Sequence, residues 1–264
     1  MKKLPLLLIA LGSLSAFAET ELDKNSVAAR AFCEERLSSP TGVQDLLEDR
    51  FNQLGFINKG GLFGGGVCWW HSRFTRSAAY LAVFDPSLPR PSDEEAKKII
   101  ERLRQRKGMT LIPGFRNLNE FSFSYQDEIQ GKLNDWQRSD GVLKASWVKG
   151  LSGNSEVGEE KLSESMDELY ERVSRGEVVY QMLQMPGVVA HAWLVTGMEI
   201  TADGYQLTVI DSNIGKDTYV FRRGMTRFNY LGWYRFVPYT GETKEEEKLR
   251  KKLTDFCGDG PQEG

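Results

Sequence analysis

The chain has 264 residues, of which 40% are hydrophobic, enough to build one sizeable core or two small lobes. Its formal net charge of -3 at pH 7 provides no basic field, which argues against nucleic acids and anionic membrane surfaces as partners. The aromatic content of 11% argues for a packed globule and against disorder.

Residues 1–18 have the pattern of a signal peptide. Two lysines precede a short apolar run at 4–14, and Ala16-Phe17-Ala18 supplies the small residues that a signal peptidase requires. The run is short for a bilayer span, and no cysteine follows the cleavage site to carry a lipid anchor. We therefore expect a mature chain that begins near Glu19, has no membrane span and is exported, either periplasmic or secreted. A retained membrane anchor is the alternative interpretation.

Residues 19–176 are expected to form the helical half of a single domain at 19–264. From Cys68 onward, apolar and aromatic residues recur at helical spacing, which predicts a buried helix. Ser92 and the three acidic residues after it start another helix, because negative charge suits a helix N-terminus. The expected helices cover 26–53 with a break at 38–42, 68–84, 92–107, 125–136 and 159–175, and the expected loops cover 58–66, 113–123 and 148–158.

Residues 177–240 are expected to form a β-rich half. Short runs of β-branched and aromatic residues alternate there with glycine-bearing turns such as Asp203-Gly204. The expected strands are 178–185, 190–199, 205–211, 217–222 and 232–239. The remaining residues, 241–264, form a C-terminal helix and tail, in which the charge run 244–252 indicates a solvated helix rather than a partner site. Helices followed by antiparallel strands predict an α+β fold.

Three cysteines in an exported chain suggest one disulfide and one free thiol. Cys33 and Cys257 lie in polar settings near the two ends of the mature chain, so a bond between them is the economical assignment. Such a large loop would stabilise the fold by roughly 2–4 kcal/mol. Cys68 would then be unpaired, either as a buried inert thiol or as a functional group.

Cys68 lies where a glycine-rich loop gives way to the expected helix, a position that suits a nucleophile. A helix N-terminus stabilises a thiolate through its dipole and its unpaired N–H groups, and the Cys68 N–H is available to an oxyanion. Gly65 and Gly66 would let a substrate backbone approach closely along the cleft. Trp69 and Trp193 are core residues by default, although both are expected beside the cleft, where Trp193 would shield the catalytic base.

The base is one of only 2 histidines. His71 lies one turn after Cys68 but has no third group to orient it. His191 opens one expected strand and Asp211 ends the next, so antiparallel pairing brings them to the same edge of the sheet. An aspartate there would favour the imidazolium and thereby the thiolate, with Asn213 as the alternative orienting residue.

These residues resemble the papain-like cysteine peptidases. The segment Gly66-Val67-Cys68-Trp69-Trp70-His71-Ser72 resembles the signature at the start of their central helix. The run 190–197 resembles the strand that carries their histidine, and Asp211-Ser212 stands where they have asparagine. His191 follows Cys68 by 123 residues, near the roughly 130 typical of papain-type enzymes. The resemblance implies a papain-like fold, with a central helix starting at the nucleophile and a C-terminal antiparallel sheet.

The chain departs from the papain pattern near the oxyanion site. Leu62 stands where those enzymes have a glutamine donor, Gly65 where they have a second cysteine, and Asn213-Ile214-Gly215 where they have a tryptophan. Gln53 and Asn58 are the nearby amides. The motifs also resemble those of transglutaminase-like acyl transferases, although these proteins usually space cysteine and histidine more closely.

The expected function is hydrolysis of an amide bond in a peptide or protein, with a cell-wall peptide as one possible substrate. Acyl transfer and an inactive papain-like binding module are the alternatives. Cys68 and His71 lack enough neighbouring ligands for a metal, and the mechanism needs no cofactor. The sequence specifies no oligomeric state.

Overall fold

The structure, a computed structural model, describes residues 22–61, 66–143, 157–184, 190–232 and 234–258. The expected signal peptide, Gly65 and most of the expected loop at 148–158 lie outside the described residues. The helices are α1 (Val27–Leu37), α2 (Gly42–Glu48), the short 3-10 helix η1 (Arg50–Asn52), α3 (Cys68–Leu81), α4 (Asp93–Arg104), α5 (Leu118–Ser124), α6 (Gln126–Leu143), α8 (Glu159–Ser174) and α9 (Thr243–Cys257). The strands are β1 (Ala82–Asp85), β2 (Thr110–Pro113), β3 (Val179–Gln184), β4 (Ala190–Thr201), β5 (Gly204–Asp211), β6 (Gly215–Arg222), β7 (Phe228–Tyr230) and β8 (Tyr234–Thr240).

The predicted α+β class is confirmed, with helices first and an antiparallel sheet second. The sheet has the strand order β6-β5-β4-β3-β8-β7. Strands β6 and β7 stand at opposite ends of that order, yet Tyr219 of β6 stacks on Phe228 of β7 with ring centroids 4.5 Å apart. The sheet is therefore strongly curled. Among the described residues, every helix is too short or too polar to span a bilayer.

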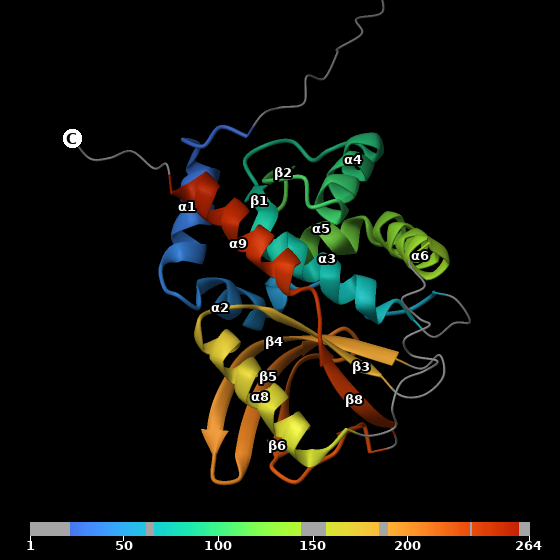
Figure 1. The fold of residues 1–264 in the computed structure, drawn as a ribbon. Coiled ribbons are helices and arrows are strands. Elements are labelled where there is room, and N and C mark those ends of the chain that lie inside the picture. The colour runs from blue at the N-terminus through green and yellow to red at the C-terminus, as the bar shows by residue number, and fades with distance from the viewer. Residues whose placement is uncertain (1–21, 62–65, 144–156, 185–189, 233, 259–264) are drawn as a thin grey trace, which may run out of the picture.

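Strand β4 separates two cores, because successive side chains of a strand point to opposite faces. Ala192 and Leu194 join the larger core with α3 and the other N-terminal helices. Trp193 and Val195 join a second core, which includes buried residues of α8 such as Leu169. Figure 1 shows the consequence, with α2, α3 and the other N-terminal helices gathered on one side of the sheet while α8 lies across it.

Two differences from the expectation change the type of element in the helical half. The expected helix 68–84 stops at Leu81, and residues 82–85 form β1, which pairs in parallel with β2. The expected irregular segment 113–123 contains α5, whose N-terminus is capped by the Asn117 side chain accepting a hydrogen bond from the Glu120 N–H. Strand β1 depends on pairing with a distant segment, and α5 depends on a single cap. Apolar periodicity in the sequence reports neither of these.

The C-terminal helix α9 is packed as well as solvated, which corrects the expectation of a simple solvated helix. Leu249 and Leu253 are buried against the larger core. At the helix start, Glu242 pairs with Arg73 of α3 at 2.8 Å and also with Arg76, which is fully buried. Burial raises the pKa of Glu242, but the neighbouring arginines outweigh it and hold that pKa below its usual value. The carboxylate therefore stays charged and fixes α9 to α3.

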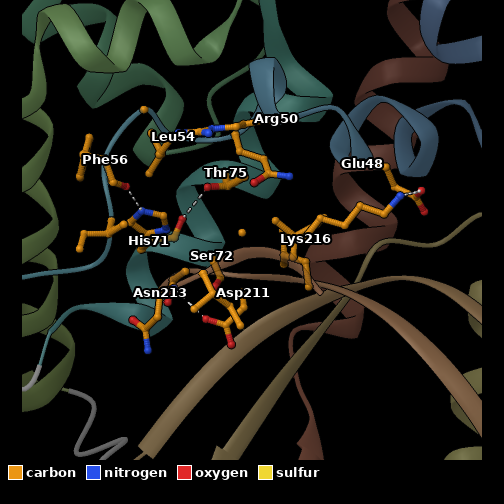
Figure 2. Close-up of a pocket in the computed structure, with 18 residues that line it drawn as sticks. Glu48, Arg50, Leu54, Phe56, His71, Ser72, Thr75, Asp211, Asn213 and Lys216 are labelled. Atoms are coloured by element: carbon orange, nitrogen blue, oxygen red, sulfur yellow. Dashed lines mark hydrogen bonds and ion pairs between the residues drawn. The ribbon is translucent and has the colours of Figure 1, made fainter. Parts of the chain in front are cut away.

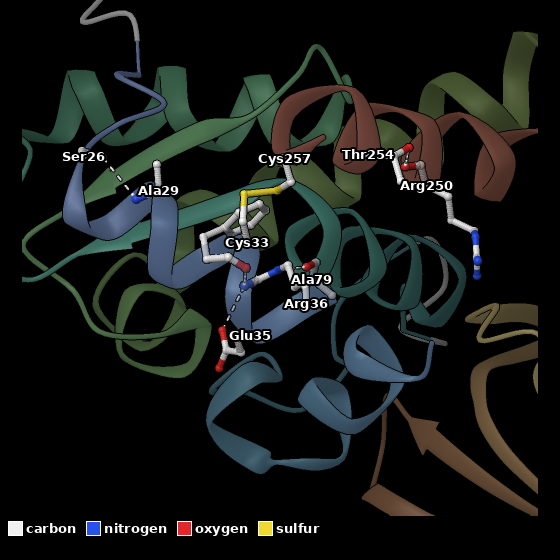
Figure 3. The surroundings of a disulfide bond; sticks show 10 residues. Ser26, Ala29, Cys33, Glu35, Arg36, Ala79, Arg250, Thr254 and Cys257 are labelled. Atoms are coloured by element: carbon white, nitrogen blue, oxygen red, sulfur yellow. Dashed lines mark hydrogen bonds and ion pairs between the residues drawn. A yellow bond between two sulfur atoms is a disulfide. The ribbon is translucent and has the colours of Figure 1, made fainter. Parts of the chain in front are cut away.

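The predicted disulfide between Cys33 and Cys257 is confirmed, and it joins α1 to the end of α9 (Figure 3). Beside it, the rings of Phe32 and Phe256 meet edge to face with centroids 6.1 Å apart. The Arg36 guanidinium lies 4.0 Å from the Phe32 ring and donates to the Ala79 carbonyl of α3 at 2.6 Å. The bond thus closes a packed junction among α1, α3 and α9.

Candidate active site

The N-terminus of α3 is fixed on the start of β4 by three successive contacts. The Cys68 thiol donates to the carbonyl oxygen of Ala190 at 3.6 Å. The Trp69 indole N–H donates to the carbonyl of His191 at 3.1 Å, and the Ser72 hydroxyl donates to the carbonyl of Ala192 at 3.2 Å. These contacts hold the only free thiol of the chain beside the histidine that opens β4.

His191 and Asp211 are in direct hydrogen-bond contact at the edge of the sheet. His191 Nε2 lies 2.7 Å from Asp211 Oδ2, and both side chains are buried. The strand register explains the meeting, because Trp193 of β4 pairs with Asp211 of β5 and places the start of β4 beside the end of β5. Since a carboxylate accepts, Nε2 carries the proton, and Nδ1 is the nitrogen left for the thiol.

The charges around His191 favour its imidazolium form. Burial lowers the pKa of His191, but hydrogen bonds to Asp211 and Cys68, together with the charges of these two groups, raise it to about 9. An imidazolium beside a sulfur stabilises the thiolate form of a cysteine. The arrangement therefore places a ring that favours its charged form beside the Cys68 sulfur.

His71 has the opposite electrostatic setting. It is buried, and burial lowers its pKa to about 4 even though its Nε2–H donates to the Phe56 carbonyl at 3.1 Å. Its ring meets the Phe56 ring edge to face, with centroids 5.6 Å apart. His71 is therefore a neutral packing residue.

Two asparagines connect this site across the two halves of the molecule. The Asn58 side chain accepts from the Val67 N–H at 2.5 Å and donates to Asn213 Oδ1 at 3.0 Å. The Asn213 N–H in turn donates to Asp211 Oδ1 at 2.7 Å. Asn213 therefore contacts the aspartate, whereas the contact with the His191 ring is made by Asp211. The role of Asn58 was not visible from the sequence, because its partners are distant in the chain.

Aromatic side chains enclose His191. The Tyr230 ring lies against the imidazole with centroids 4.6 Å apart, a neighbour that the sequence pattern did not indicate. Trp193 meets the imidazole edge to face at 6.5 Å. Trp69 is 5% exposed and Trp193 is 2% exposed, so both act by packing rather than by lining an open cleft.

Gly66 adopts a backbone conformation that favours glycine, with φ at +85°. A Cβ atom at this position would lie 2.3 Å from Asn58 Nδ2. The close approach of the Gly66 backbone is therefore needed for the Asn58 side chain to reach its partners. Gly65, the other glycine expected along the cleft, lies outside the described residues.

A cavity of about 430 Å³ lies behind Asp211, between residues 48–57, helix α3 and the turn from β5 to β6 (Figure 2). Asp211 and His71 line it, whereas Cys68 and His191 do not. In Figure 2, Lys216 extends across this space to Glu48, with which it forms an ion pair of 2.6 Å. Asp211 thus contacts His191 on one side and lines the cavity on the other.

Within the described residues, no group of three or more histidine, cysteine, aspartate or glutamate side chains is placed to hold a metal ion. Comparison with known proteins finds no matching family model, no matching curated protein and no matching solved structure.

Proposed function

We propose that this chain is a thiol-dependent amide hydrolase in which Cys68 is the nucleophile, His191 the general base and Asp211 the residue that orients His191. The observation that carries the proposal is the buried 2.7 Å contact between His191 and Asp211 beside the free thiol. A papain-like fold is part of the proposal. Its support is the helix that begins at Cys68, the antiparallel sheet that carries His191 and the order of the three residues along the chain.

In the proposed reaction, the Cys68 proton passes to His191 Nδ1 and the sulfur attacks the carbonyl carbon of the amide. The Trp70 and His71 N–H groups of α3 already donate to the Val67 carbonyl, so the proposal assigns the Cys68 and Trp69 N–H groups, at the first helical positions, to the oxyanion. His191 then protonates the leaving amine as the C–N bond breaks. His191 then takes a proton from water, the resulting hydroxide attacks the thioester carbonyl, and the C–S bond breaks as the proton on His191 passes to the sulfur.

The test is release of primary amines from unfolded casein and from peptidoglycan-derived peptides, measured by fluorescamine. We expect turnover by the wild-type protein and none by Cys68→Ala, with a thermal midpoint within about ten degrees of wild type. The matched control is Asp217→Asn, because Asp217 is an exposed aspartate of β6. Equal turnover by Cys68→Ala, or incorporation of an added amine in place of hydrolysis, would contradict the proposal.

A further inference from the structure

We propose that the cavity behind Asp211 binds the carboxyl-terminal residue of a peptide, with Arg50 holding the carboxylate and the exposed isoleucines of the lining covering an apolar side chain. The volume of about 430 Å³ lies in the range of small-molecule sites, roughly 300–1,000 Å³. This site is distinct from the attacking sulfur, because Cys68 does not line the cavity.

Among the described residues, the charges of the lining leave one cation, Arg50, without an ion-pair partner. Glu48 and Lys216 neutralise each other, and Asp211 is occupied by His191. His71 is neutral because burial lowers its pKa to about 4. Arg50 forms no ion pair with any described residue, so the cavity favours an anion, and a guanidinium can bind a carboxylate through two hydrogen bonds.

The polar groups inside the cavity suit an amide as well as a carboxylate. Gln53 uses its Nε2–H₂ to donate to the Leu47 carbonyl at 2.9 Å, which leaves its Oε1 as an acceptor for a peptide N–H. The Ser212 hydroxyl is buried without a hydrogen-bond partner among the described residues. A buried hydroxyl without a partner is costly, and a ligand carbonyl or carboxylate would satisfy it.

Two exposed apolar side chains belong to the lining of the cavity. Ile57 is 67% exposed and Ile214 is 51% exposed, and both line the cavity, one in the segment before α3 and the other in the turn from β5 to β6. Covering both with an apolar side chain would remove their surface from water. An anionic head, an amide N–H and an apolar side chain together describe the last residue of a peptide.

Titration calorimetry with the Cys68→Ala protein tests the site independently of catalysis. The probe is N-acetyl-L-leucine, and the controls are N-acetyl-L-leucinamide, which lacks the carboxylate, and octanoate, which lacks the amide. We expect saturable binding of the probe with a Kd below about 1 mM. Each control should bind at least about tenfold more weakly, because each loses one charged or polar contact.

Variants locate the binding. Arg50→Gln should weaken binding by about ten- to hundredfold, and Ile214→Asp should abolish it. Arg30→Gln is the matched control, because Arg30 is an exposed arginine of α1 outside the cavity, and it should bind like the parent protein. The His71 imidazole NMR signal should shift on binding, because His71 lines the cavity.

Three results would overturn the inference. They are no saturable binding up to about 10 mM, equal affinity for the acid and its amide, or an unchanged affinity in Arg50→Gln. None of them depends on Cys68 chemistry, so the amide-hydrolase proposal stands or falls separately.

Discussion

Replacing Asp211 by asparagine removes the charge that keeps His191 protonated while preserving the shape of the side chain. The pKa of His191 is about 9, against an ordinary value of 6.5, and burial alone acts in the opposite direction. The difference corresponds to about 3 kcal/mol in favour of the imidazolium. In Asp211→Asn the burial remains and the carboxylate is lost, so the pKa of His191 should fall by more than about two units.

The assay is a proton–nitrogen NMR titration of the imidazole rings between about pH 4 and pH 10. The chain has only 2 histidines, and burial lowers the pKa of His71 to about 4, so the two signals separate without ambiguity. Asp217→Asn is the matched control and should leave both titrations unchanged. A wild-type His191 that titrates near its ordinary value, or near 9 in both wild type and Asp211→Asn, would refute the electrostatic reasoning.

The same shift predicts how stability depends on pH. A pKa raised in the folded state contributes stability that is fully present below pH 6.5, the ordinary histidine value, and is lost as pH rises through about 9. Urea unfolding of the wild-type protein should therefore show a loss of at most about 3 kcal/mol over that window. Asp211→Asn should lack this loss.

Three further outcomes rest on the packing around the site. Replacing Cys33 and Cys257 together by serine should lower the free energy of unfolding by about 2–4 kcal/mol in urea titrations, and an unchanged midpoint would contradict the role of the bond. Glu242→Gln removes the charge that compensates buried arginines of α3 and should cost about 3–5 kcal/mol at pH 7, with a smaller cost as the pH falls through the lowered pKa of Glu242 and the wild-type carboxylate also protonates. Gly66→Ala should displace Asn58 and slow alkylation of the neighbouring thiol, and labelling at the wild-type rate would show that the close approach is unimportant.

The sheet half was largely predictable because its order is local. The alternating residues of β4 and β5 and the turn at Asp203-Gly204 define an antiparallel hairpin, and this pairing brings His191 beside Asp211. Helix α8 was equally visible, since its apolar spacing is regular and Gly176, where φ is +80°, follows shortly after its last residue Ser174. These elements depend on neighbours in the sequence.

The features that the sequence did not reveal depend on distant partners. Strand β1 looks like the last turn of the preceding helix until β2 pairs with it in parallel. The charge run 244–252 was expected to be solvated, because Glu246 meets its buried partners Tyr80 and the Val178 N–H only in the folded chain. The clamp made by Asn58 and the position of Tyr230 over the imidazole likewise require the two halves to be assembled.

The most direct test of the activated thiol is the pH profile of Cys68 alkylation by iodoacetamide. Without reductant only Cys68 reacts, because the other two cysteines form the disulfide. The profile, rather than the absolute rate, is the readout, since Cys68 is 7% exposed. We predict labelling well below pH 8.5, the approximate midpoint of a free thiol, and its loss in His191→Ala. A wild-type profile that follows the free thiol and is indifferent to His191 would contradict the account.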